Sequence, residues 1–173
     1  MLKTFLPVAL ALGTPAVAAE PSPKPPACTD TPAYHAQDFI LGTWAVHAGD
    51  ILIAHVTITP ALDHCALSEV WTPVNDMPDK GLGLFAFSRP EGKWRYLWAA
   101  DTATSSFFEG TAVKPGEMLY TTTRLLGDGR SRLRHWQLIV LPDGRIRELA
   151  TDSDDEGKTW ITEYDLTWSR SEA

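Results

Sequence analysis

The sequence predicts an all-β protein, built as an antiparallel up-and-down β-barrel of about ten strands. From residue 39 onward, β-branched and aromatic residues alternate with polar ones at a period of two. The runs recur about every 8–14 residues. The connections between them are too short for the crossovers that parallel strands need, and no amphipathic helix fits between the runs. Closing the sheet buries its edges, whereas the alternative, a two-sheet sandwich, would fill the interior with side chains.

The first residues have the features of a secretory signal peptide, assigned to residues 1–19. Lys3 supplies a positive charge, an apolar stretch follows, and Ala16-Val17-Ala18 is a small-residue cleavage site. The stretch is shorter than the about 20 residues that cross a bilayer core, so the protein is not expected to span a membrane. We therefore expect export to the periplasm or the extracellular space.

Residues 20–38 form a proline-rich leader segment, expected to be extended and semi-rigid, before a barrel domain over residues 39–170. Cys28 lies in the leader, and Cys65 is the other cysteine of the chain. An even pair in an exported protein most simply forms one disulfide, which would pin the leader to the domain. A lipid anchor on Cys28 and a C-x-x-C redox pair both lack their sequence patterns.

Ten runs are expected to form the strands of the barrel. In chain order they are Thr43 to His47, Ile51 to Thr59, Ala66 to Thr72, Leu82 to Ser88, Lys93 to Ala100, Phe107 to Ala112, Met118 to Leu125, Arg132 to Leu141, Arg145 to Thr151 and Thr159 to Trp168.

The turn Leu141-Pro142-Asp143-Gly144-Arg145 suits a type I turn followed by a left-handed glycine bulge. This turn fixes the register of the two flanking strands and puts their mostly apolar side on the inner face. A two-residue turn would exchange the faces. The expected inward pairs are Val140 with Ile146, Leu138 with Glu148, Trp136 with Ala150 and Arg134 with Asp152.

A second turn, from Ser153 to Trp160, fits the S-x-D-x-G-x-T-W pattern of the Asp box found in sialidase-type propellers. In that pattern, Ser and Asp side chains bind turn amides while the Trp packs beside them. One copy cannot build a propeller, so the motif predicts a stabilised hairpin and no sialidase activity.

Several segments together carry a resemblance to a known family. Gly42-Thr43-Trp44 is similar to the G-x-W opening of lipocalins, whose Trp plugs one end of the barrel. With His64 to Trp71, Lys93 to Trp98, Leu141 to Arg147 and Gly157 to Trp160, the chain resembles a bacterial, often exported, lipocalin-like family of unknown function. The resemblance implies an architecture and no activity. Ala150 and Thr151 stand where the family has a Trp and an acidic residue, which implies a wider or differently lined pocket.

Alternation predicts which side chains line the interior. Leu67, Glu69 and Trp71 share one face of their strand, as do Trp94, Tyr96 and Trp98. The last strand would present Trp160, Thr162, Tyr164, Leu166 and Trp168. From these sets and the paired strands, the candidate ligand-binding residues are Glu69, Trp71, Trp94, Tyr96, Trp98, Arg134, Trp136, Glu148 and Tyr164.

Glu69 and Glu148 are the candidate catalytic or anchoring groups, because a carboxyl turned into an aromatic cavity has a raised pKa unless it is paired. The alternative is a structural ion pair with Arg134, or plain solvation. The arginines at positions 130, 132 and 134 are expected to form a solvated stripe balanced by Asp152, Asp154 and Asp155, and the alternative is a contact with an anionic head group.

No cofactor or metal is expected. The histidines lack H-x-H or H-x-x-x-H spacing, and related haem-binding barrels use a His near the last strand, whereas no His follows His135. The net charge of −7 disfavours nucleic acid as a partner. The sequence therefore predicts binding of a small hydrophobic or amphipathic molecule, and the alternatives are a cavity enzyme using a buried Glu or a non-catalytic protein-interaction module. It leaves the oligomeric state open.

Overall fold

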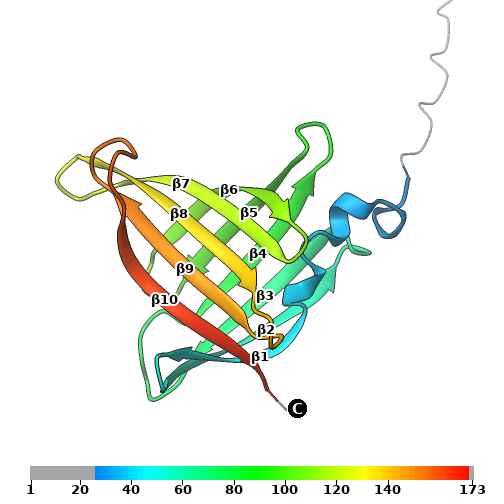
Figure 1. The fold of residues 1–173 in the computed structure, drawn as a ribbon, viewed down its shortest axis with the longest axis horizontal. Coiled ribbons are helices and arrows are strands. Elements are labelled where there is room, and N and C mark those ends of the chain that lie inside the picture. Colours follow the sequence, from blue (N-terminus) through cyan, green and yellow to red (C-terminus); the bar gives the residue numbers. More distant parts are fainter. Residues whose placement is uncertain (1–25, 172–173) are drawn as a thin grey trace, which may run out of the picture.

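The computed structural model describes residues 26–171, which form a closed barrel of ten antiparallel strands. Each strand pairs with its neighbours in the sequence, and β1 closes on β10 (Figure 1). The predicted up-and-down barrel is confirmed, while the predicted signal peptide lies outside the described residues. The strands are β1 (Gly42–Ala48), β2 (Ile51–Ala61), β3 (Ala66–Pro73), β4 (Gly81–Ser88), β5 (Lys93–Ala100), β6 (Ser105–Lys114), β7 (Glu117–Leu125), β8 (Ser131–Val140), β9 (Ile146–Ser153) and β10 (Ile161–Arg170).

Three short 3-10 helices, η1 (Cys28–Asp30), η2 (Pro32–His35) and η3 (Asp38–Ile40), precede the barrel and lie at one of its ends, in blue in Figure 1. We call residues 28–40 the end plug. The expectation of an extended leader is wrong for this stretch, because Pro32 suits the first position of η2, where its missing N–H costs no hydrogen bond.

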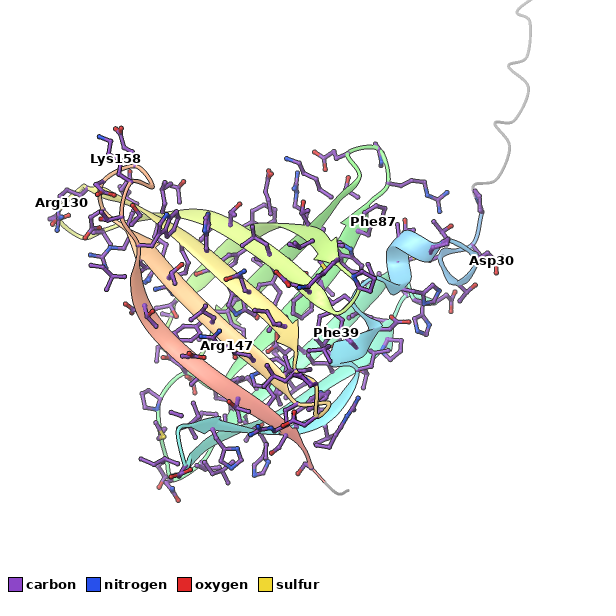
Figure 2. All side chains as sticks on the ribbon, in the orientation of Figure 1. Asp30, Phe39, Phe87, Arg130, Arg147 and Lys158 are labelled. Carbon is purple, nitrogen blue, oxygen red and sulfur yellow. A yellow bond between two sulfur atoms is a disulfide. The ribbon has the colours of Figure 1, made fainter. Side chains whose placement is uncertain are left out.

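The plug is fastened to the barrel by the predicted disulfide, which is confirmed. Cys28 is bonded to Cys65 in the β2–β3 turn, with the two Cα atoms 5.1 Å apart. Tyr34 of the plug is buried and meets the ring of Phe87 edge-on at 5.2 Å. Figure 2 shows Phe87 beside the plug and Arg130 and Lys158 on hairpins at the opposite end.

The plug end of the barrel is filled with side chains. Trp44 is buried, donates a hydrogen bond of 2.8 Å from its indole to the carbonyl of Ile40, and lies 3.8 Å below the guanidinium of Arg170. Gln37 is fully buried and accepts a hydrogen bond from the hydroxyl of Tyr120. This end of the barrel is therefore closed by packing as well as by the disulfide.

The turn between β8 and β9 has the predicted form. Gly144 has a φ of +82°, and hydrogen bonds join its amide to the carbonyl of Leu141 and the amide of Leu141 to the carbonyl of Arg145. The predicted register is confirmed, with Leu138 opposite Glu148 and the other expected pairs in place.

The hairpin between β9 and β10 is an Asp box, as predicted. The hydroxyl of Ser153 accepts a hydrogen bond of 2.8 Å from the amide of Gly157. The carboxylate of Asp155 accepts hydrogen bonds from the amide and the hydroxyl of Thr159, at 2.8 and 2.7 Å. These bonds lower the pKa of Asp155 to about 2.

The predicted inner face of β10 is confirmed for Tyr164, Leu166 and Trp168 and is wrong for Trp160 and Thr162. Thr162 pairs with Thr151 and Tyr164 with Ala150, so Glu163 is an extra residue in a β-bulge. The bulge shifts the alternation by one position. Trp160 consequently stacks on His135 on the outside of the barrel, with ring centroids 3.8 Å apart, and Thr162 is exposed.

Candidate functional site: an aromatic cavity with two buried carboxyls

The half of the barrel away from the plug holds a cavity of about 480 Å³. Its wall draws on most of the strands, because every second side chain of each strand points inward. The lining residues are Ile53, Glu69, Trp71, Asp79, Tyr96, Trp98, Thr104, Ser106, Phe108, Arg124, Arg134, Trp136, Glu148, Tyr164 and Leu166.

The structure brings eight of the nine predicted ligand-binding residues together on this wall. Trp94 is the exception. It faces inward, as alternation requires, but it lies near the plug end, buried against Phe87 with ring centroids 5.8 Å apart. Alternation fixes the face of a strand and not the depth along the barrel, so Trp94 belongs to the packed core.

Glu69 on β3 is only 3% exposed. One of its oxygens accepts a hydrogen bond of 2.8 Å from the hydroxyl of Tyr96. Burial raises the pKa of Glu69 to about 8, the Tyr96 hydrogen bond opposes that shift, and the negative charge of Glu148 adds to it. Glu69 is therefore a carboxyl that exchanges its proton near neutral pH.

A glycine on the neighbouring strand makes room for this pair. Gly83 on β4 lies opposite Glu69, and a Cβ atom there would collide with the carboxyl and lie 2.7 Å from the ring of Tyr96. A position without a side chain lets both groups cross the inner face of β4.

Glu148 on β9 is held by two indoles. Trp136 donates to one carboxyl oxygen at 2.9 Å, and Trp168 donates to the other at 2.8 Å. Burial raises the pKa of Glu148, whereas hydrogen bonds from Trp168, Trp136 and Tyr164 act to lower it. Both oxygens thus have a neutral donor, and the group is fixed in the floor of the cavity.

The wall away from the plug carries a cluster of arginines and aspartates. Arg134 donates to both oxygens of Asp152, at 2.7 and 2.8 Å. Arg132 binds Asp154 in the same two-pronged way, and Arg124 lies 4.0 Å from Asp152. Burial acts to raise the pKa of Asp152, but Arg134 lowers it overall.

This arrangement settles which alternative holds for Arg134. Its salt-bridge partners among the described residues are Asp152 and Glu163, so it forms no ion pair with Glu69 or Glu148. Arg134 is also not part of a solvated stripe, since its side chain is 11% exposed.

Sequence reasoning missed several lining residues. Ser106 and Phe108 alternate inward on β6 and follow the period-two pattern, so that signal could have identified them. Asp79 and Thr104 lie in loops, where no periodicity indicates direction.

A second polar cluster lies at the plug. Potential ligand atoms of His35, Asp38 and His64 lie within 4.8 Å of one another, although their spacing in the sequence gave no metal signal. Both nitrogens of His35 are already engaged, Nδ1 with Asp38 at 2.6 Å and Nε2 with the carbonyl of Thr29 at 3.0 Å. The hydrogen bond to Asp38 raises the pKa of His35, so in this arrangement the histidine fastens the plug.

Within residues 26–171, the structure contains no helix that is long and apolar enough to cross a membrane. In comparisons with known proteins, no family model matches the chain and no curated protein matches it.

Proposed function

We propose that the protein binds a small hydrophobic or amphipathic molecule inside the barrel. The observation that carries the proposal is the cavity of about 480 Å³, a size within the range of small-molecule sites. Its apolar wall is largely aromatic, which favours a flat or extended apolar ligand. The aromatic members are Trp71, Tyr96, Trp98, Phe108, Trp136 and Tyr164.

The cavity also separates this function from that of a protein-interaction module. A module that works through its surface needs no internal space, and its barrel would be filled by side chains throughout. Here the filled half, around Trp44 and Phe85, stops where the cavity begins. The interior space therefore favours a ligand-binding role.

We also propose that the protein is exported and that it belongs to the lipocalin-like family that its sequence resembles. The signal-like residues 1–19 and the Cys28–Cys65 disulfide support an oxidising compartment such as the periplasm or the extracellular space. Trp44 fills the closed end of the barrel, as expected for the lipocalin-like family that the sequence resembles.

A cavity enzyme is the second candidate. The observation in its favour is Glu69, whose pKa of about 8 suits a general acid or base at neutral pH. Replacing Glu69 by Gln would abolish turnover in such an enzyme while leaving the affinity for a neutral substrate nearly unchanged.

The binding function is tested by titrating the purified mature protein with the neutral dye N-phenyl-1-naphthylamine and following the dye's fluorescence. Trp98→Ala removes a wall residue and should weaken dye binding at least about fivefold. The matched control is Phe107→Ala, since Phe107 is an aromatic residue on the outer face of β6, 54% exposed. Equal affinity in the wild type and Trp98→Ala, or no binding of the dye at all, would contradict the proposal.

A further inference from the structure

We propose that the cavity selects a cationic ligand: an amine or quaternary ammonium group on an apolar body, with its positive charge held between Glu69, Glu148 and the surrounding aromatic rings. This inference rests on the proposed function, because it names the ligand class of the same cavity.

The two buried carboxyls have no counter-charge among the described residues. Glu69 and Glu148 are 3% and 6% exposed, and their hydrogen bonds come from neutral donors: Tyr96 for Glu69, and Trp136, Trp168 and Tyr164 for Glu148. Among the described residues, no Lys, Arg or His forms an ion pair with either carboxyl. Because an unpaired buried charge is unfavourable, a cation entering the cavity gains more here than a neutral group does.

Arg134, the more buried of the two arginines on the cavity wall, is already paired. Arg134 donates hydrogen bonds to both carboxylate oxygens of Asp152. Arg124 and Arg132 also lie near Asp152, at 4.0 and 3.7 Å. An anionic group that reached past this cluster would meet two carboxyls. The interior therefore discriminates against anions, and an acidic amphiphile such as a fatty acid fits it poorly.

The aromatic rings lie close to both carboxyls. Tyr96, which binds Glu69, lies 4.7 Å from Trp136, which binds Glu148, measured between ring centroids. Phe108 completes the group at 5.6 Å from Trp136. Ring faces attract ammonium groups, most strongly where water is excluded. A cation beside both carboxyls thus also lies against these rings.

Release of the Glu69 proton on binding should make the affinity for a cation depend on pH. The groups that face Glu69 are the phenols of Tyr96, Tyr120 and Tyr164 and the carboxyl of Glu148, and Asp79, Arg124 and Arg134 share the cavity. Since the pKa of Glu69 is about 8, a cation that needs its carboxylate must expel a proton below that pH. Affinity for the cation should then rise up to about tenfold between pH 6 and pH 7 and level off above pH 8.

The test compares three probes with the same phenyl group and similar chains: 4-phenylbutylamine, 4-phenylbutan-1-ol and 4-phenylbutanoate. Each is titrated calorimetrically into the mature protein at pH 7.5. The amine should bind at least about tenfold more tightly than the alcohol, and the carboxylate should bind most weakly. Repeating the amine titration in buffers of different ionisation enthalpy should reveal proton release.

Glu69→Gln is the diagnostic variant, because the amide oxygen can still accept the hydrogen bond of Tyr96. It should remove most of the amine's advantage over the alcohol and the pH dependence of amine binding. Glu109→Gln is the matched control. Glu109 is an exposed carboxylate on the outer face of β6, bound to Lys93 at 2.7 Å, and its loss should leave the preference unchanged.

Two sets of outcomes separate this inference from the proposed function. Tighter or equal binding of the alcohol or the carboxylate, or an unchanged preference in Glu69→Gln, overturns the cationic ligand and leaves the binding cavity intact. The same holds if none of the three probes binds while N-phenyl-1-naphthylamine does. If the dye fails as well, the proposed function itself is overturned.

Discussion

The pH dependence of stability offers a direct measure of the state of Glu69. Its pKa is about 8 in the folded barrel against an ordinary value of 4.5, so the folded state keeps a proton that the unfolded chain releases. The stabilisation from this group is complete below pH 4.5 and is lost as the pH rises through 8. The slope is about 1.4 kcal/mol per pH unit between the two values.

The perturbation is Glu69→Gln, which cannot titrate. Between pH 5 and pH 8, the free energy of unfolding of the variant should gain roughly 3–4 kcal/mol relative to the wild type. Taking the difference between the two proteins removes the contributions of the other titrating groups, such as Asp152 and Asp155, whose pKa values are lowered.

The assay is equilibrium unfolding in urea, followed by tryptophan fluorescence at pH 5, 6, 7 and 8, with Glu109→Gln measured in parallel. Glu109 is exposed and its pKa is lowered, so its variant should differ from the wild type by a constant amount between pH 6 and 8. A difference for Glu69→Gln that also stays constant would refute the reasoning, because it would mean that Glu69 is ionised in the folded barrel across the whole range.

Three further predictions concern the plug, the cavity wall and the floor. Replacing Cys28 and Cys65 together by Ser should lower the free energy of unfolding in urea by about 4 kcal/mol, which is the chain-entropy value for their separation of 37 residues. An unchanged free energy of unfolding would show that the plug stays in place without the disulfide. Gly83→Ala, which drives a methyl group into the Glu69–Tyr96 pair, should cost about 1–3 kcal/mol and weaken dye binding in the titration described above. Trp168→Phe removes one donor from Glu148 and should lower the free energy of unfolding in urea by about 1–3 kcal/mol; an unchanged stability would mean that this indole does not hold the carboxyl.

Local rules account for what could be predicted from the sequence. The turn at Leu141-Pro142-Asp143-Gly144-Arg145 determines its own geometry, and one turn sets the register of two whole strands. The turn thus paired Glu148 with Leu138, and the apolar character of that side of the two strands predicted that Glu148 points inward. Alternation likewise placed Glu69 on the inner face, because β3 has no interruption between residues 66 and 73.

The failures occurred where a distant contact or an irregularity decides the structure. The bulge at Glu163 reverses the faces of Trp160 and Thr162, and no turn residue announces it. The predicted register already placed Asp152 opposite Arg134, and the salt bridge between them rules out the alternative of an ion pair between Arg134 and Glu69 or Glu148. The depth of Trp94 depends on how strands are staggered around a closed barrel, which a single strand does not encode.

The pH dependence of stability and the preference for a cationic ligand have one origin, the burial of Glu69 without a counter-charge. Above pH 7, burial of Glu69 without a counter-charge makes the empty barrel less stable than a version with a neutral side chain. A cation bound beside Glu69 and Glu148 reverses that loss, because it supplies the positive charge that the described side chains around them do not. Ligand binding should therefore stabilise the wild-type barrel more at pH 8 than at pH 6, and the same ligand should gain little from pH in Glu69→Gln. A cavity that only enclosed an apolar molecule would give equal stabilisation at both pH values.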